Sequence, residues 1–334
     1  IILNAGGVLT LTGGIIATST NATASAVIGS QSVGSSANGV LDLNGAAAFS
    51  MDVGAVSVAG RDVAPLTATL IVNSVIQNGG IAKSGNGVLQ LNAQANFTGG
   101  FNVAAGGLKN GVTNAGSRLS RLTLAAGSRY DLNNINTTWG SLAGSGDIFS
   151  SIASPNLQVG FDGTSSTFSG RIQRFNNALN PTLTKVGGGV LTLDAAQDGD
   201  ASIGQIIVGG GTLRYAGAGK AFVGTALLTT SLVANTNGTL QLDNTGTNVA
   251  NRLGLAAAGN LYVQGGKFVL GCNAGAATSE TLANLSAPST PSTSTLTTSK
   301  VDDLAASLMV IRSDLKCVAS DINEQHNKVV ALES

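Results

Sequence analysis

The fold is decided by a short phrase that reads Gly189-Val190-Leu191-Thr192-Leu193-Asp194. Apolar and polar side chains alternate through it, which is the period of a β-strand with one buried face. The closing aspartate can hydrogen-bond the backbone two residues further on and so turn the chain. Similar phrases occur at 7–12, 39–44, 87–92 and 238–243, and a degenerate copy at 122–124. The repeat predicts many short strands separated by turns.

The composition supports an all-β chain and excludes several partners. Glycine contributes 46 of the 334 residues, and each glycine inside a helix costs about 1 kcal/mol relative to alanine, so long helices are disfavoured over most of the chain. The 17 basic and 17 acidic side chains cancel, which leaves no electrostatic footprint for nucleic acid or anionic lipid. No run of about 18 apolar residues occurs, so we expect no membrane-inserted helix.

Two architectures accommodate such short strands: a sandwich or barrel, and a parallel β-helix. We favour the β-helix (solenoid), because similar phrases can then stack so that leucine lies over leucine in one continuous core. The phrases are 32, 48 and 33 residues apart, which a stack of coils tolerates through loops of different length. We expect coils that average roughly 16–24 residues and stack at about 4.8 Å. The inward residues are predicted to be Leu89, Leu91, Leu191, Leu193, Leu240 and Leu242, and the outward ones Gln90, Thr192 and Gln241.

The composition changes near residue 285, which predicts three segments. These are a β-helical rod over 1–285, a linker rich in Ser, Thr and Pro over 286–299, and a coiled-coil helix over 300–334. An amphipathic helix packed on the rod is the alternative, but a strict 3-4 spacing favours a separate coiled coil, and mixed residue types on its seam favour a trimer. The predicted oligomerisation residues are Val301, Leu304, Leu308, Ile311, Leu315, Val318, Ile322, Gln325, Val329 and Leu332.

Two longer stretches extend the repeat. Residues 83–92 read Lys-Ser-Gly-Asn-Gly-Val-Leu-Gln-Leu-Asn, and residues 183–193 read Leu-Thr-Lys-Val-Gly-Gly-Gly-Val-Leu-Thr-Leu. Together with Asn96-Phe97-Thr98-Gly99-Gly100 and Gly106-Gly107-Leu108, they resemble the autotransporter-associated β-strand repeat of bacterial passenger domains. The resemblance covers most of residues 80–215 and implies a right-handed parallel β-helix exposed outside a cell. It implies no catalytic residues.

An autotransporter passenger is followed by a membrane β-barrel, whereas here a predicted coiled coil follows. A repetitive β-rod joined to an oligomerising helix looks more like a virion fibre or spike. We therefore expect a non-enzymatic, extracellular structural fibre on a virion surface that serves host attachment or spacing. The alternative is a passenger-type adhesin on a bacterial surface. The predicted partners are other copies of the chain and a cell-surface receptor or glycan.

Enzyme classes that need histidine or zinc are disfavoured by residue counts. The one histidine, His326, leaves no imidazole base in the first 325 residues, and two cysteines cannot complete a Cys/His zinc site. The stretch 214–221 fails as a phosphate loop, since Arg214 replaces its first glycine and Ala221 its Ser or Thr. Asp194, Asp198 and Asp200 could contact calcium, but a turn role already explains Asp194. We therefore assign no catalytic, cofactor or metal residues.

A polysaccharide depolymerase is the enzymatic hypothesis that remains open. Such an enzyme would use two carboxylates in a surface groove, and the candidates are Asp131, Asp147 and Asp162. Tyr130 and Trp139 could stack on a sugar, although packing in the core is the favoured interpretation. Each of the three aspartates also fits a turn.

Overall fold

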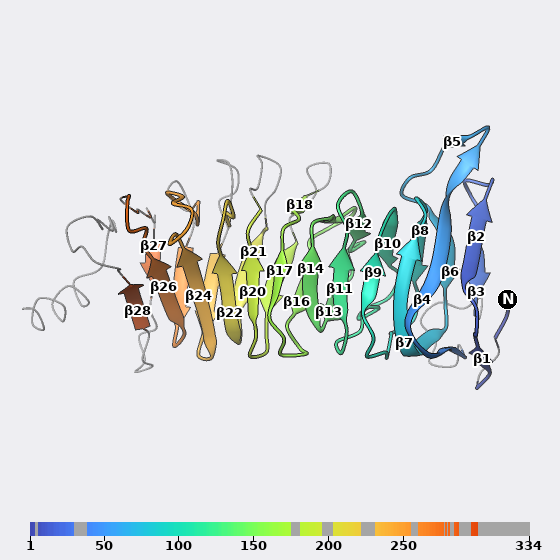
Figure 1. The fold of residues 1–334 in the computed structure, drawn as a ribbon, viewed down its shortest axis with the longest axis horizontal. Coiled ribbons are helices and arrows are strands. Elements are labelled where there is room, and N and C mark those ends of the chain that lie inside the picture. Colours follow the sequence, from blue (N-terminus) through green and yellow to red (C-terminus); the bar gives the residue numbers. More distant parts are fainter. Residues whose placement is uncertain are drawn as a thin grey trace, which may run out of the picture.

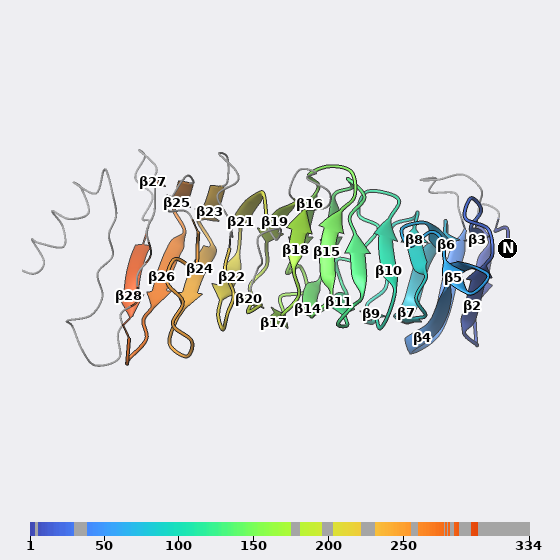
Figure 2. The same ribbon diagram turned by 90° about the horizontal axis from the view of Figure 1, so that it is seen from above.

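The computed structural model describes residues 1–3, 6–29, 39–174, 181–195, 203–221, 231–254, 260–276, 278, 280, 284–286 and 295–299. These residues form an elongated rod of stacked β-coils (Figures 1 and 2). Along the rod, the strands of the longest sheet follow one another in sequence order from β1 to β28. All but one of the pairings between named strands are parallel. The chain therefore has the all-β, parallel solenoid architecture that the repeat predicted.

Three sheets form the sides of the rod, and we call them the long sheet, the N-terminal sheet and the C-terminal sheet. The long sheet contains β1 (Val8–Thr10), β2 (Ile15–Ser19), β4 (Val40–Val58), β5 (Arg61–Asp62), β7 (Val75–Ser84), β9 (Phe101–Val103), β11 (Arg121–Leu124), β14 (Ser141–Gly144), β17 (Ser166–Phe168), β20 (Val190–Leu193), β22 (Gly211–Tyr215), β24 (Gly238–Asp243), β26 (Lys267–Gly271) and β28 (Thr295–Ser299). The N-terminal sheet contains β3 (Ala26–Ile28), β6 (Ala68–Val72), β8 (Val88–Leu91), β10 (Gly107–Asn110), β12 (Arg129–Asp131), β15 (Asp147–Ser150) and β18 (Ile172–Arg174). The C-terminal sheet contains β13 (Thr137–Trp139), β16 (Asn156–Val159), β19 (Thr182–Lys185), β21 (Gln205–Val208), β23 (Ser231–Asn235), β25 (Asn260–Gln264) and β27 (Asn284–Ser286).

The second side of the rod changes along its length. Early coils alternate between the long sheet and the N-terminal sheet, as in β7, β8, β9 and β10. The three coils from β11 to β19 place a strand in each of the three sheets. From β19 onward the chain alternates between the C-terminal sheet and the long sheet. The rod is thus two-sided at both ends and three-sided in its middle.

The core is a set of parallel ladders of buried apolar side chains. Leu191, Leu213, Leu240 and Phe268 are aligned in successive strands of the long sheet, and each is at most 2% exposed. All six leucines predicted to point inward are buried. Gln90 and Gln241 are half-buried, whereas Thr192 is only 5% exposed because the Arg214 side chain covers it, with Nε 3.2 Å from its hydroxyl.

The five phrases do not all stack on one another as expected. Leu9 lies in register with Leu41 in the long sheet, as predicted. Leu89, however, belongs to the N-terminal sheet, where its partners are Leu70 and Leu108. The same phrase thus forms a strand on either side of the rod, because alternating side chains specify a buried face but not which sheet supplies it.

Coil length varies more than the sequence suggested. Aligned residues are 20 or 21 positions apart from Ile81 to Leu142. The spacing rises to 27 or 28 toward the C-terminal end of the long sheet. Near the N-terminal end it is 35 between Leu41 and Ile76 and 44 between Ala26 and Leu70. Several coils are therefore longer than the expected average of 16–24 residues, since loops bulge outward without disturbing the stacked strands.

The described rod also extends further along the chain than the predicted boundary at residue 285. Residues 295–299 form β28, which pairs with β26 inside the segment predicted as a linker. The predicted coiled coil and all ten of its seam residues, from Val301 to Leu332, lie outside the described residues. No helix long and apolar enough to cross a membrane occurs among the described residues.

Two interior lysines close corners of the rod, and the sequence analysis did not anticipate them. Lys83 is aligned with Met51 and Val103, and its Nζ donates to the carbonyls of Ser84, Gly85 and Ala105 at 2.8–3.0 Å. Burial lowers the pKa of Lys83 to about 8. The stem of the lysine thus fills the core while its ammonium group satisfies three turn carbonyls.

Lys185 repeats this arrangement in the C-terminal sheet. Its Nζ donates to the carbonyls of Val186, Gly187 and Gly210, and burial lowers its pKa to about 8 as well. Both lysines begin the motif Lys-x-Gly-x-Gly-Val-Leu, at 83–89 and 185–191. The first glycine of each motif has positive φ, and a Cβ there would lie within 2.4 Å of a carbonyl oxygen in a neighbouring coil. This motif is the signal in the sequence for a turn whose carbonyls accept hydrogen bonds from a buried lysine.

Replacing either lysine by methionine is expected to destabilise the rod by about 2 kcal/mol. Methionine keeps most of the apolar stem but leaves three carbonyls, most of them partly buried, without their donor. Lys267→Met is the matched control, because Lys267 is an exposed residue of β26. Denaturant unfolding of the three variants would measure the difference. Equal midpoints for Lys83→Met and Lys267→Met would contradict the proposed corner role.

Candidate functional site

A groove with a volume of about 330 Å³ lies on the outer face of the N-terminal sheet. One wall is the segment that follows β5, and the floor is formed by β8, β10, β12 and β15. The lining residues are Asp62, Pro65, Leu66, Asn86, Val88, Gly106, Gly107, Leu108, Lys109, Gly127, Arg129, Asp131 and Phe149. We call this feature the β5 groove.

The wall exists because β4 continues into a hairpin that projects from the rod (Figure 1). Ser57 and Val58 pair antiparallel with Asp62 and Arg61 across the two residues Ala59 and Gly60. Both of these turn residues have positive φ, 50° and 77°, which a two-residue hairpin loop with a type I′ turn requires. β5 is the one named strand, within the described part of the chain, that runs antiparallel to its neighbour.

The floor follows from strand register. Parallel pairing places Gly107, Arg129 and Asp147 in one outward ladder. Lys109, Asp131 and Phe149 form the next ladder, two residues further along each strand. Charged groups from three coils therefore lie on the same face, although aligned positions are 18 to 22 residues apart in the sequence.

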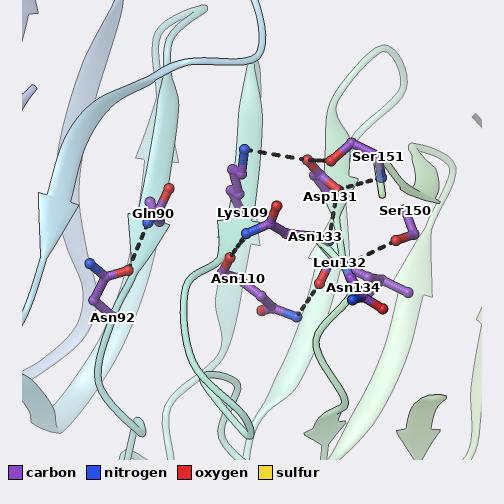
Figure 3. A network of polar contacts seen from close by, with 10 residues as sticks. All are labelled: Gln90, Asn92, Lys109, Asn110, Asp131, Leu132, Asn133, Asn134, Ser150 and Ser151. Carbon is purple, nitrogen blue, oxygen red and sulfur yellow. Dashed lines mark hydrogen bonds and ion pairs between the residues drawn. The ribbon is translucent and has the colours of Figure 1, made fainter. Parts of the chain in front are cut away.

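Asp131, the first carboxylate candidate, is fully engaged in holding two coils together. Its oxygens accept hydrogen bonds from the backbone N–H of Asn133 at 2.8 Å, and from the N–H and hydroxyl of Ser151 at 3.0 and 2.8 Å. The ammonium of Lys109 lies 3.8 Å away (Figure 3). Asp131 therefore closes a turn and links it to the next coil, which is the turn role that its sequence context suggested.

Asn110 continues this polar network toward the interior. Its side-chain oxygen accepts a hydrogen bond from the Tyr130 hydroxyl at 2.8 Å. Its backbone carbonyl accepts one from Asn133 Nδ2 at 2.8 Å (Figure 3). One coil earlier, the buried Asn92 donates from Nδ2 to Asn73 at 2.8 Å. These asparagines satisfy buried backbone and side-chain groups at successive turns.

The other two carboxylate candidates are also engaged. Asp147 forms a two-pronged ion pair with Arg171 of the next coil, at 3.0 and 2.9 Å. Asp162 follows β16 and accepts hydrogen bonds from the Ser141 hydroxyl at 2.7 Å and from the N–H and hydroxyl of Thr164 at 2.9 and 2.8 Å. Asp131 and Asp147 share the outer face of the N-terminal sheet, whereas Asp162 belongs to the turn beyond the C-terminal sheet. The structure does not bring the three carboxylates together.

Tyr130 and Trp139 are core residues with no exposed surface. The Trp139 Nε1–H donates to the Tyr130 hydroxyl at 3.1 Å, and the two rings meet edge to face at 6.2 Å. Burial raises the pKa of Tyr130 to about 12. The favoured interpretation of packing is confirmed, and neither ring can stack on a sugar at the surface.

The segment 214–221 cannot cradle a phosphate. A phosphate loop presents free backbone N–H groups, but here Ala218 N donates to Asp194 and Gly219 N to Ala216. The carbonyls of Gly217 and Gly219 instead accept hydrogen bonds from Arg252.

No group of three metal-ligating side chains occurs among the described residues. Of the three calcium candidates, Asp194 is described and its carbonyl accepts the hydrogen bond from Ala218 that closes a turn. Asp198 and Asp200 lie outside the described residues.

Two polar groups of the β5 groove retain bonding capacity. The Arg129 guanidinium forms no hydrogen bond or ion pair with any described residue. The Asp62 carboxylate accepts one hydrogen bond within the described part, from Ala64 N to Oδ1 at 3.1 Å. One donor group and one acceptor group are therefore available at the surface.

Comparison of the chain with models of protein families, with curated proteins and with solved structures found no match. The class of protein is therefore defined by the fold itself, a parallel β-solenoid whose second side changes from one short sheet to another.

Proposed function

We propose that this chain is a non-enzymatic structural fibre exposed on a surface, and that it is a virion fibre subunit serving host attachment or spacing. In this proposal the rod is a right-handed β-helix, and the helix over 300–334 joins three copies. The alternative is a passenger-type adhesin on a bacterial surface. One observation carries the proposal: stacked coils extend along one axis while all three candidate carboxylates hold the coils together.

The rod supports a spacing role because its length follows from the number of coils. Neighbouring strands lie about 4.8 Å apart, so each added coil lengthens the rod by that amount. Loops can project from any coil without interrupting the core, as the β5 hairpin does. Such a solenoid keeps a binding face at a set distance from its point of attachment.

Removing residues 300–334 is expected to leave a folded but monomeric rod, because the described strands all lie before residue 300. Replacing Leu308 and Leu315 together by Asp should have the same effect through charge repulsion on the predicted seam. Light scattering of the complete chain, the truncated chain and the double variant would measure the change from three copies to one. An identical oligomer number for all three proteins would contradict the fibre proposal.

A glycan depolymerase is the second candidate, and the outer-face position of Asp131 and Asp147 is the observation in its favour. We expect no oligosaccharide release when the complete chain is incubated with capsular or cell-surface polysaccharides. Size-exclusion chromatography of the polysaccharide would detect cleavage. Release that disappears in Asp147→Asn or Asp162→Asn would replace the structural proposal by the enzymatic one.

A further inference from the structure

The β5 groove combines features that define a ligand class. Asp62 on the hairpin and Arg129 on β12 line the same cavity, and both are exposed. Each retains hydrogen-bonding capacity toward solvent, since Arg129 has no partner and Asp62 one partner among the described residues. The other charged pair in the lining, Lys109 and Asp131, is already joined at 3.8 Å.

The charge balance of the groove excludes a strongly charged ligand. Its lining contains two cations, Lys109 and Arg129, and two anions, Asp62 and Asp131, so the formal charges cancel. The adjacent pair of Asp147 and Arg171 is neutral as well. Without an excess of one sign there is no long-range attraction for a polyanion or a polycation.

Apart from the amide of Asn86, the remaining lining is apolar or lacks side chains. Pro65 and Leu66 contribute apolar surface, while Gly127, where an added Cβ would meet nothing, leaves backbone open. The volume of about 330 Å³ lies at the small end of the ~300–1,000 Å³ typical of ligand pockets. A short ligand with an apolar face and several hydroxyl groups suits this combination.

We infer that the β5 groove binds a neutral sugar unit of a glycan, with Asp62 accepting from and Arg129 donating to its hydroxyl groups. A hydroxyl both donates and accepts, so neighbouring hydroxyls of one ring can satisfy a carboxylate and a guanidinium together. The C–H face of the ring packs on Pro65 and Leu66. This inference rests on the proposed attachment function and identifies the ligand class of that function.

The test uses the complete chain, fluorescently labelled, on an array of neutral and acidic oligosaccharides. We expect binding to neutral members, followed by a loss of at least tenfold in affinity for Arg129→Ala and for Asp62→Ala. Arg129→Ala is the cleaner variant, because no described residue depends on its guanidinium. Arg118→Ala is the matched control, since Arg118 is an exposed arginine stacked on Phe161 in a different groove, and it should bind within twofold of the unchanged chain.

Several results would overturn the inference: no binding to neutral oligosaccharides, binding to acidic members only, or unchanged binding by Arg129→Ala. Loss of binding in Arg118→Ala rather than Arg129→Ala would place the glycan in the other groove and overturn it too. The fibre proposal is judged separately by the oligomer number of the complete chain. A trimer that binds no glycan therefore contradicts this inference alone.

Discussion

Leu191→Asp is expected to destabilise the rod by at least ~4 kcal/mol and to unfold several coils around β20. Leu191 is 2% exposed and is aligned with Ser166 of the preceding coil and Leu213 of the following one. The substitution removes a buried leucine and places a carboxylate where no donor is available. Because each coil is stabilised mainly by its neighbours, the damage should spread along the stack. Circular dichroism during urea unfolding would measure the loss.

Thr192→Asp is the control for this prediction, since it makes the same change one residue further along the strand. Thr192 belongs to the outer face, and the Arg214 Nε lies 3.2 Å from its hydroxyl. A carboxylate there can pair with the arginine, so we expect a change of less than about 1 kcal/mol. If Thr192→Asp proved as damaging as Leu191→Asp, the assignment of inner and outer faces would be wrong.

Arg252→Met is expected to destabilise the C-terminal coils by about 3–5 kcal/mol. Arg252 has no exposed surface, and its guanidinium donates to five backbone carbonyls and to the side chain of Asn244. The accepting carbonyls belong to turns after β22 and β24, at Ala216, Gly217, Gly219, Asp243 and Thr247. Methionine fills the space but leaves these acceptors without donors.

Hydrogen exchange would locate the effect of Arg252→Met. Amides of β22, β24 and β26 should lose protection, while those of β8, β10 and β12 should not. Arg214→Met is the matched control, because the Arg214 side chain is 38% exposed and its ion pair with Asp243 spans 3.8 Å. We expect the control to cost no more than about 1 kcal/mol. Equal exchange in both variants would show that Arg252 does not hold these turns.

Glu280 completes the region around Arg252. Its carboxylate accepts hydrogen bonds from the backbone N–H groups of Arg252 and Leu253, the latter at 3.2 Å. Burial raises the pKa of Glu280 to about 7 despite these bonds and the nearby Arg252 charge. The hydrogen-exchange comparison should therefore be made at one constant pH.

The sequence predicted the class of fold because its information is local and repeated. An apolar-polar period of two identifies strands, and the turn residues between them limit strand length. The inward direction of the six predicted leucines follows from that period alone, and the structure confirms it. The packing of Tyr130 and Trp139 was likewise expected, since large aromatic side chains bury a large apolar area when they lie in the core.

The candidate groove could not be predicted in the same way. Asp62 lies far from Arg129 and Asp131 in the sequence, and only the turn at Ala59 and Gly60 and the stacking of successive coils bring it to their cavity. The sequence indicated three carboxylates as a candidate set, but register separates Asp162 from the other two. Register depends on the number of residues in each coil. Because the loops differ in length, the sequence alone does not show which residues are aligned.

The sequence by itself therefore determined the strand period, the buried leucines and the parallel solenoid they build. Only the tertiary structure decided which sheet each phrase joins, so that Leu89 and Leu191 occupy different sides of the rod. It also decided that Lys83, Lys185 and Arg252 point inward, where a charged residue is unexpected from hydropathy. The physical reason is that turn carbonyls from separate coils need a common donor, and those carbonyls come together only when the coils stack.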